Sequence, residues 1–229
     1  MANYIGKRKT GSFIAPSNVL VMGIDEAGRG PVIGPMIICG VVVKESNILE
    51  LTKKGVRDSK SLSSHHREEL KKEIEFLCDG YELVNISPQQ IDEEGMNDLE
   101  LRSAVGLIKR FLPQEVFLDA PTRNCRLYEK RIRDFLPSGT KIKLVVENFA
   151  DKNYPIVGAA SILAKVERDR RIRELEGVYG SLGSGYPSDE KTIEFLRGYL
   201  RRGVGFPPIV RRRWKTIKRV KEECEREVF

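Results

Sequence analysis

Histidine is almost missing from this sequence of 229 residues, which has only the neighbours His65 and His66. Successive residues of a helix point about 100° apart, so these two side chains would not share one metal ion. Their scarcity nearly excludes histidine-dependent catalytic triads and histidine-rich metal sites. Acid–base or metal chemistry would therefore depend on carboxylates.

Paired cysteines and long apolar runs are also missing. The four cysteines, at positions 39, 78, 125 and 224, share no short spacing, which predicts thiols in a reducing compartment rather than a zinc ribbon or a redox pair. The longest apolar stretch, residues 36–43, is too short to span a bilayer. Residues 1–17 contain no extended apolar segment, so no signal peptide is predicted. We expect a cytoplasmic protein without membrane contact.

Acidic residues are absent from one segment near the C-terminus. Ten cations and no acid lie between Arg197 and Lys221, and the last 33 residues hold 11 cations against 4 acids, which accounts for the whole net charge of +7. Such a segment favours a polyanion as partner, because neutralised phosphates release counterions. A merely solvated tail is the alternative. Trp214 within it either stacks on nucleic acid or packs against its own domain.

Strands and helices alternate along most of the chain, which predicts an α/β fold with a central sheet. Strands are expected over residues 19–25, 36–44, 82–86, 115–119 and 141–147. Helices are expected over residues 64–78, from a serine cap at 87, around 101–111, around 128–135, over 155–176, from a serine cap at 188 to 200, and over 216–225.

Acids follow three of these apolar strands. Asp25 and Glu26 end the first strand, Asp119 ends the strand at 115–119, and Asp151 follows the last strand. The carboxyl ends of parallel strands meet at one edge of a sheet, so the four side chains could come together. Clustered carboxylates repel one another unless a cation neutralises them, and an all-oxygen donor set favours Mg²⁺ or Mn²⁺. The alternative reading is that each acid is only a polar strand end.

Gly28, Arg29 and Gly30 come directly after the first acidic pair. Glycine lets a backbone approach a ligand closely, and a guanidinium suits a phosphate. The dinucleotide-binding fingerprint is not matched, because the glycine spacing differs and a strand follows instead of a helix. A loop that merely turns the chain is the open alternative.

Several sequence blocks, in the same order as in that family, resemble ribonuclease HII over about residues 19–216. They are residues 23–31 (GIDEAGRGP), 33–35 (IGP), 58–62 (DSKSL), 118–119 (LD), 150–155 (ADKNYP), 159–166 (AASILAKV) with 168–169 (RD), and 183–189 (GSGYPSD). The first block and AASILAKV are the most specific. The proline after Tyr186 is similar to the archaeal branch.

The resemblance implies a ribonuclease H-like fold with a central mixed sheet flanked by helices. Along the chain we expect a flexible or loosely docked arm over residues 1–18, a catalytic domain over 19–180 and a small, basic, helical substrate-binding region over 181–229. The expected activity is endonucleolytic hydrolysis of the RNA strand in RNA–DNA hybrids. Incision 5′ of ribonucleotides embedded in duplex DNA is also expected, and it would serve ribonucleotide removal.

By family analogy, two divalent ions would be held by Asp25, Glu26, Asp119 and Asp151, and the products would carry 5′-phosphate and 3′-hydroxyl ends. The glycine loop at 28–30 would contact the backbone at the scissile phosphate and sense the 2′-hydroxyl. The resemblance also implies substrate contacts outside this loop, to a sugar from Tyr186 and to phosphates from Lys60 and Lys165. A monomer is expected, and a sliding clamp as partner is neither predicted nor excluded.

Two features depart from the family pattern. Asn148-Phe149 stands where archaeal relatives often have His-Lys, which puts a local proton shuttle in doubt, and the N-terminal arm is long. Two rival functions remain. A nucleic-acid-binding protein without catalysis fits the basic segment but not the four acids. A Mg²⁺-dependent phosphotransferase is disfavoured by the missing phosphate-loop lysine motif.

Overall fold

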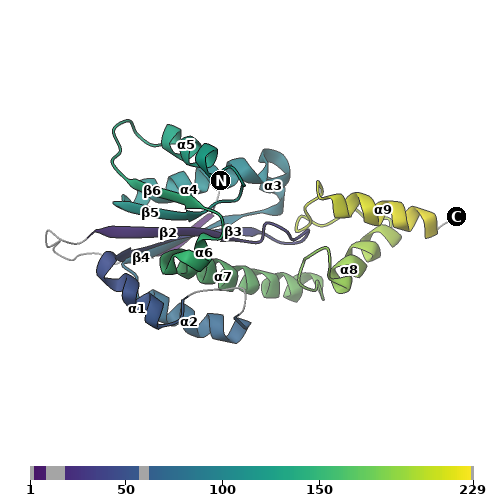
Figure 1. Ribbon diagram of the computed structural model, residues 1–229. Coiled ribbons are helices and arrows are strands. Elements are labelled where there is room, and N and C mark those ends of the chain that lie inside the picture. The colour runs from purple at the N-terminus through teal and green to yellow at the C-terminus, as the bar shows by residue number, and fades with distance from the viewer. Residues whose placement is uncertain (1–2, 9–18, 57–61, 228–229) are drawn as a thin grey trace.

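A six-stranded mixed sheet forms the centre of the computed structural model, which describes residues 3–8, 19–56 and 62–227 (Figure 1). The strand order is β1-β4-β3-β2-β5-β6, and only the pairs β2–β5 and β5–β6 are parallel. The strands are β1 (Asn3–Arg8), β2 (Leu20–Ala27), β3 (Met36–Lys44), β4 (Gly80–Ile86), β5 (Glu115–Asp119) and β6 (Lys143–Glu147). The predicted central mixed sheet is confirmed.

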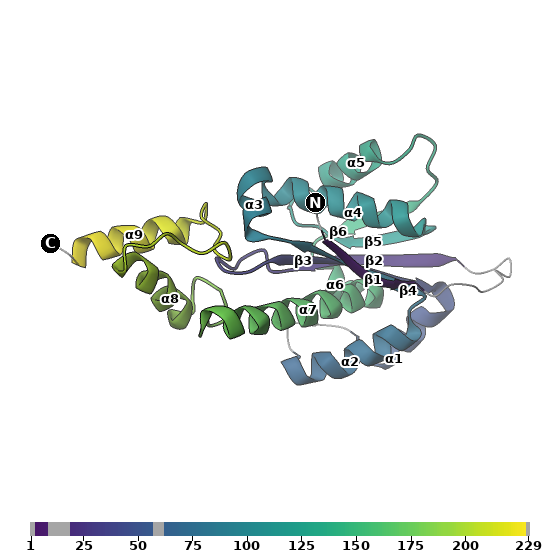
Figure 2. The same ribbon diagram turned by 180° about the vertical axis from the view of Figure 1, so that it is seen from behind.

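Helices cover both faces of this sheet, as Figures 1 and 2 show from opposite sides. One face carries α3 (Pro88–Glu94), α4 (Met96–Phe111) and α5 (Cys125–Phe135). The other carries α1 (Ile48–Lys53), which follows the short helix η1 (Glu45–Asn47), together with α2 (Ser64–Leu77) and α7 (Pro155–Tyr179). The central strand β3 is buried along almost its whole length, which explains its continuous apolar sequence. The capping box predicted at Ser87 and Gln90 is present at the start of α3.

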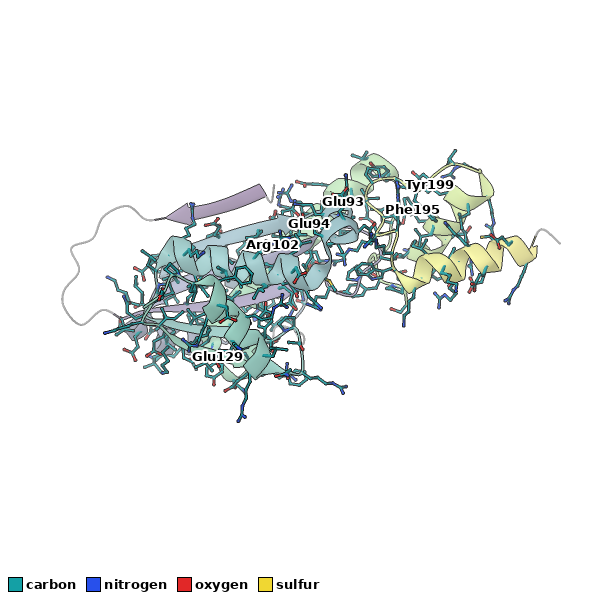
Figure 3. The ribbon with its side chains drawn as sticks, turned by 90° about the horizontal axis from the view of Figure 1, so that it is seen from above. Glu93, Glu94, Arg102, Glu129, Phe195 and Tyr199 are labelled. Carbon is teal, nitrogen blue, oxygen red and sulfur yellow. The ribbon has the colours of Figure 1, made fainter. Side chains whose placement is uncertain are left out.

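The C-terminal region has a third apolar cluster of its own. It contains α8 (Glu190–Arg201) and α9 (Lys215–Glu227), which extend beyond the end of α7 (Figure 1). Phe195 and Tyr199 of α8 form an aromatic pair with ring centroids 5.1 Å apart (Figure 3). Val32 and Ile33, which follow the glycine loop, belong to the same cluster and join the region to the sheet domain.

Two predictions about local structure were wrong. Residues Asn3–Arg8 of the supposed flexible arm form the edge strand β1, because β4 offers an open antiparallel edge with which they pair. The cap of α8 is Asp189 instead of Ser188, since the Asp189 carboxylate accepts hydrogen bonds from the N–H groups of both Lys191 and Ser184. The predicted boundaries of the arm and of the two larger regions stay predictions. No helix in the described ranges is long and apolar enough to cross a membrane.

Gly23 of β2 allows the sheet to approach α7 closely. A Cβ atom at this position would lie 2.2 Å from the carbonyl oxygen of Ile156, so any side chain would push the helix away. We expect Gly23→Ala to destabilise the protein by about 3 kcal/mol through overpacking. Gly177→Ala is the matched control, because no atom lies within 4 Å of its Cβ position, and we expect a gain of about 1 kcal/mol from helix propensity. Urea unfolding measures both, and equal effects would contradict this account.

Candidate active site

The four predicted carboxylates line a single cleft of about 660 Å³. Ile24 of β2 pairs with Leu118 of β5, so the next residues of these parallel strands, Asp25 and Asp119, lie side by side at the edge of the sheet. Glu26 is the neighbour of Asp25 on β2. The fourth acid lies on the short helix α6 (Ala150–Asn153), which follows β6. The convergence expected from the strand ends is therefore present.

Asp151 is held in the cleft by the turn that begins α6. The N–H of Ala150 donates to Asp119 Oδ1 over 2.9 Å, which ties α6 to the end of β5. The Asp151 side chain is 1% exposed, and neither of its oxygens has a hydrogen-bond partner. Leaving two buried carboxylate oxygens without a hydrogen-bond partner is costly. A bound cation would satisfy both oxygens, as expected of a metal ligand.

Burial and mutual repulsion raise the pKa values of the first acidic pair. The pKa of Asp25 rises to about 7, chiefly because the carboxyl is buried, although a hydrogen bond from Ser161 on α7 opposes this. The charges of Asp119 and Asp151 raise the pKa further. Burial also raises the pKa of Glu26, and the charge of Asp25 adds to the effect. A bound cation would relieve this repulsion.

The residues fit a hard divalent cation through the chemistry of their donors. All four are carboxylates, as Mg²⁺ and Mn²⁺ prefer, and Asp151 has two orphaned oxygens. Within the described ranges, no group of three or more His, Cys, Asp or Glu side chains is already arranged as a metal-binding cluster. The fit therefore depends on the donor set and its burial, and not on a preformed coordination sphere.

The glycine loop forms one wall of the same cleft. Gly28 has a φ of 97°, and a Cβ there would lie 2.8 Å from the oxygen of Pro35, so only glycine fits. Gly30 lies beside Tyr186, whose ring would be 3.3 Å from a Cβ at residue 30. The guanidinium of Arg29 lines the cleft but donates to Glu100 and Asn97 of α4.

The other predicted substrate residues are placed as follows. Tyr186 lines the cleft with part of its ring exposed, and the guanidinium of Arg168 lies 5.1 Å from the ring centroid. Lys165 also lines the cleft, and its Nζ donates to Ser161 Oγ over 3.0 Å. Lys60 lies outside the described residues. The structure thus brings every predicted site residue that it describes to one cleft.

The basic segment contains a buried residue whose position sequence reasoning misjudged. Arg211 was counted among the cations that face a polyanion, yet it is fully buried and donates to the carbonyl oxygens of Gly28, Arg29 and Gly34. The Nε1 of Trp214 donates to Gly30 O, so this tryptophan packs within the protein, as is commoner for a lone tryptophan.

Other cations of this segment are paired in space with acids that precede or follow it in sequence. Arg197 contacts Glu190 and Glu223, and Arg201 contacts Glu194. The number of cations between Arg197 and Lys221 is therefore larger than the number that can contact a polyanion, because acids outside this segment form ion pairs with some of them. The exposed side chains of Arg213, Lys215 and Lys221 are less constrained and remain candidates for phosphate contact.

Comparison with known proteins gives a consistent result. Residues 22–217 match the family model described as Ribonuclease HII. The Ribonuclease HII of Pyrococcus abyssi is 45% identical over 210 residues, which cover 90% of this chain and 93% of that protein. The crystal structure of the ribonuclease H2 from Pyrococcus horikoshii OT3 matches with a TM-score of 0.82 and 40% identity over 90% of this chain and 99% of that one. The PCNA:RNase HII complex from Archaeoglobus fulgidus matches with a TM-score of 0.79 and 38% identity over 88% and 96%.

Proposed function

Because the chain belongs to the ribonuclease HII family, whose members are endonucleases that act on RNA–DNA hybrids, we propose that it also incises duplex DNA 5′ of single embedded ribonucleotides by two-metal catalysis. The observation that carries the proposal is the gathering of Asp25, Glu26, Asp119 and Asp151 in one cleft. A role in removing ribonucleotides from DNA follows from this activity.

The four carboxylates would hold the divalent ions, Mg²⁺ or Mn²⁺. When bound, such ions supply an activated water and stabilise the leaving 3′ oxygen. The protein itself holds the acids in place through Ser161, which hydrogen-bonds to Asp25, and through Ala150, which donates to Asp119. Both contacts keep the site preorganised, so little reorganisation is required during the reaction.

Recognition of a ribonucleotide is assigned to the wall formed by the glycine loop and Tyr186. Gly30 lies beside the ring of Tyr186. Because residue 30 has no side chain, a sugar that packs on this ring can approach the backbone of the loop. The 2′-hydroxyl is the group that distinguishes RNA from DNA, and it can both donate and accept a hydrogen bond. Lys165, which also lines the cleft, is suited to a phosphate. A sliding-clamp partner, which the sequence left open, is supported by the PCNA complex of the Archaeoglobus relative.

The proposal is tested with an end-labelled DNA duplex that carries one ribonucleotide, beside a long RNA–DNA hybrid and an all-DNA duplex. In Mg²⁺ or Mn²⁺ we expect one cut 5′ of the ribonucleotide, with 5′-phosphate and 3′-hydroxyl ends, and no cut in DNA alone. Asp151→Asn should lower the rate by about a thousandfold without loss of duplex binding. Asp134→Asn, an exposed aspartate on α5, is the control and should cleave normally.

Two results would overturn the proposal. Tight binding of the duplex without cleavage in either ion would mean that the carboxylates are not a working site, and a binding protein would be the better description. Turnover of a free nucleotide without cleavage of the duplex would favour a phosphotransferase.

A further inference from the structure

Phe149 has a backbone conformation that side chains rarely adopt. Its φ of 62° and ψ of 32° lie in the left-handed region, and Leu112 is the other described non-glycine residue with a positive φ. Glycine and asparagine occupy this region most readily, because a larger L-residue is strained there. Both residues are apolar and exposed, Phe149 by 62% and Leu112 by 71%. The fold therefore keeps an aromatic ring in water at a strained position.

Several hydrogen bonds determine the turn around Phe149. Asn148 donates from its amide to two carbonyl oxygens of the loop after β5, over 3.0 and 2.9 Å. Ala150 donates to Asp119, as described above, and the N–H of Lys152 donates to the carbonyl oxygen of Phe149. A turn held at this many points fixes the backbone at Phe149 relative to the carboxylates.

The turn follows the end of β6, at the edge of the sheet where Asp119 lies, and Asp151 of this turn lines the cleft while Phe149 and Lys152 lie outside its lining. Phe149 precedes Asp151 by two residues, and α6 stands between the end of β6 and the start of α7 (Figure 1). The Nζ of Lys152, an exposed residue of α6, lies 5.9 Å from the centroid of the Phe149 ring. An exposed aromatic ring and a cation are thus paired on the turn that carries Asp151.

This pairing is the combination with which proteins bind a nucleic-acid strand. Aromatic rings pack on bases and sugars, while lysine side chains neutralise the adjoining phosphates. A strand whose scissile phosphate lies at the four carboxylates has its neighbouring nucleotides within reach of the turn that carries Asp151. A surface of this kind is complementary to the strand both in charge and in apolar character.

We propose that Phe149 and Lys152 form a substrate contact at the rim of the cleft. The ring packs against the nucleic-acid strand beside the scissile phosphate, and the ammonium group meets a neighbouring phosphate. This inference rests on the proposed function, because its ligand is the substrate of the same site. It assigns a binding role to the strained turn in addition to the placement of Asp151.

Phe149→Gly and Leu112→Gly are the matched pair that tests this contact. Both changes remove an exposed apolar side chain from a left-handed position, so both should raise the melting temperature. Only Phe149→Gly should weaken binding of a fluorescently labelled, ribonucleotide-containing duplex, by about tenfold, which is within the usual range for the loss of one aromatic contact. Binding is measured by anisotropy without divalent ions, and KM is measured in Mg²⁺. We expect KM to rise by about the same factor while kcat stays within about twofold.

Two further variants complete the test. Phe149→Trp should retain affinity, and Lys152→Ala should lower the slope of log Kd against log salt by about one. If Phe149→Gly fails to fold, Phe149→Asn replaces it, since asparagine tolerates the left-handed region, and the same loss of affinity is expected. Unchanged affinity in folded Phe149→Gly or Phe149→Asn would overturn the rim contact and leave the proposed function standing. Failure of the wild-type protein both to bind and to cut the duplex would overturn the two together.

Discussion

Replacing Asp25 with asparagine is expected to make the metal-free protein more stable and, with the same change, to slow cleavage by about a thousandfold. The side chain of Asp25 is 5% exposed, and burial is the main reason that its pKa rises from an ordinary 3.8 to about 7. Asparagine has nearly the same shape but no charge to bury. It also cannot supply the anionic oxygen that a divalent ion needs.

The pH dependence of stability follows from the direction of this shift. An acid with a higher pKa in the folded state binds its proton more tightly when folded. Relative to high pH, the tighter proton binding by Asp25 stabilises the folded state fully below pH 3.8. This stabilisation is lost as the pH rises to about 7, and above that pH the free energy of unfolding changes no further on account of Asp25. The loss corresponds to about 4 kcal/mol, which the asparagine variant avoids.

Thermal unfolding in EDTA at about pH 5 and about pH 8 checks this result. The wild-type protein should lose more stability between the two pH values than Asp25→Asn does, and the variant should melt higher at the upper pH. Added Mg²⁺ should then stabilise the wild type more than the variant, because a ligand bound only by the folded state raises the melting temperature. An identical pH dependence in both proteins would show that Asp25 is not a strained, buried acid.

Local sequence patterns correctly predicted helices and strands whose residues all have the same surroundings, such as a strand that is buried from end to end. Residues Met36–Lys44 form an uninterrupted apolar run because β3 lies in the middle of the sheet with helices on both faces. Asp25 and Asp119 could be placed together for a similarly simple reason. Each follows an apolar run near the end of its strand, and neighbouring parallel strands end at the same edge.

The features that sequence did not predict depend on partners distant in the chain. The segment Asn3–Arg8 has no apolar alternation and becomes a strand only because the edge of β4 is open to it. The ion pair between Arg29 and Glu100 joins residues 71 positions apart, and neither local pattern indicates it. Arg211 stands in a run of three arginines, and only the tertiary fold decides which of them turns inward. Composition therefore indicated the sign of the charge correctly but not its accessibility.

Arg211→Met is expected to have the second large effect, because it removes the centre of the contact between the C-terminal region and the glycine loop. The guanidinium donates from Nε, Nη1 and Nη2 to three backbone carbonyls, over 3.0, 3.1 and 2.6 Å, and the side chain is completely buried. Burial lowers the pKa of Arg211 to about 9, which leaves the group charged at neutral pH. Methionine fills a similar volume and donates no hydrogen bond.

The cost of this change has two parts. Buried carbonyl oxygens left without a donor should destabilise the protein by about 3–5 kcal/mol. The three carbonyls belong to Gly28, Arg29 and Gly34, so the loop that faces the substrate should also lose its position. A displacement of about 1 Å in such a loop can cost about a hundredfold in rate. We expect kcat to fall by about that factor at a temperature where the variant is still folded.

Arg213→Met is the matched control, since it makes the same substitution two residues away on an exposed side chain. The backbone N–H of Arg213 donates to Asp92, and this contact does not depend on the side chain. The control should unfold at nearly the same urea concentration as the wild type and should lose only part of the salt-dependent affinity for the duplex. If both variants keep nearly the wild-type urea midpoint and kcat, Arg211 does not hold the loop in place. If only Arg211→Met loses stability and kcat, the basic segment has two roles: its buried Arg211 holds the glycine loop in position, and its exposed cations contact the substrate.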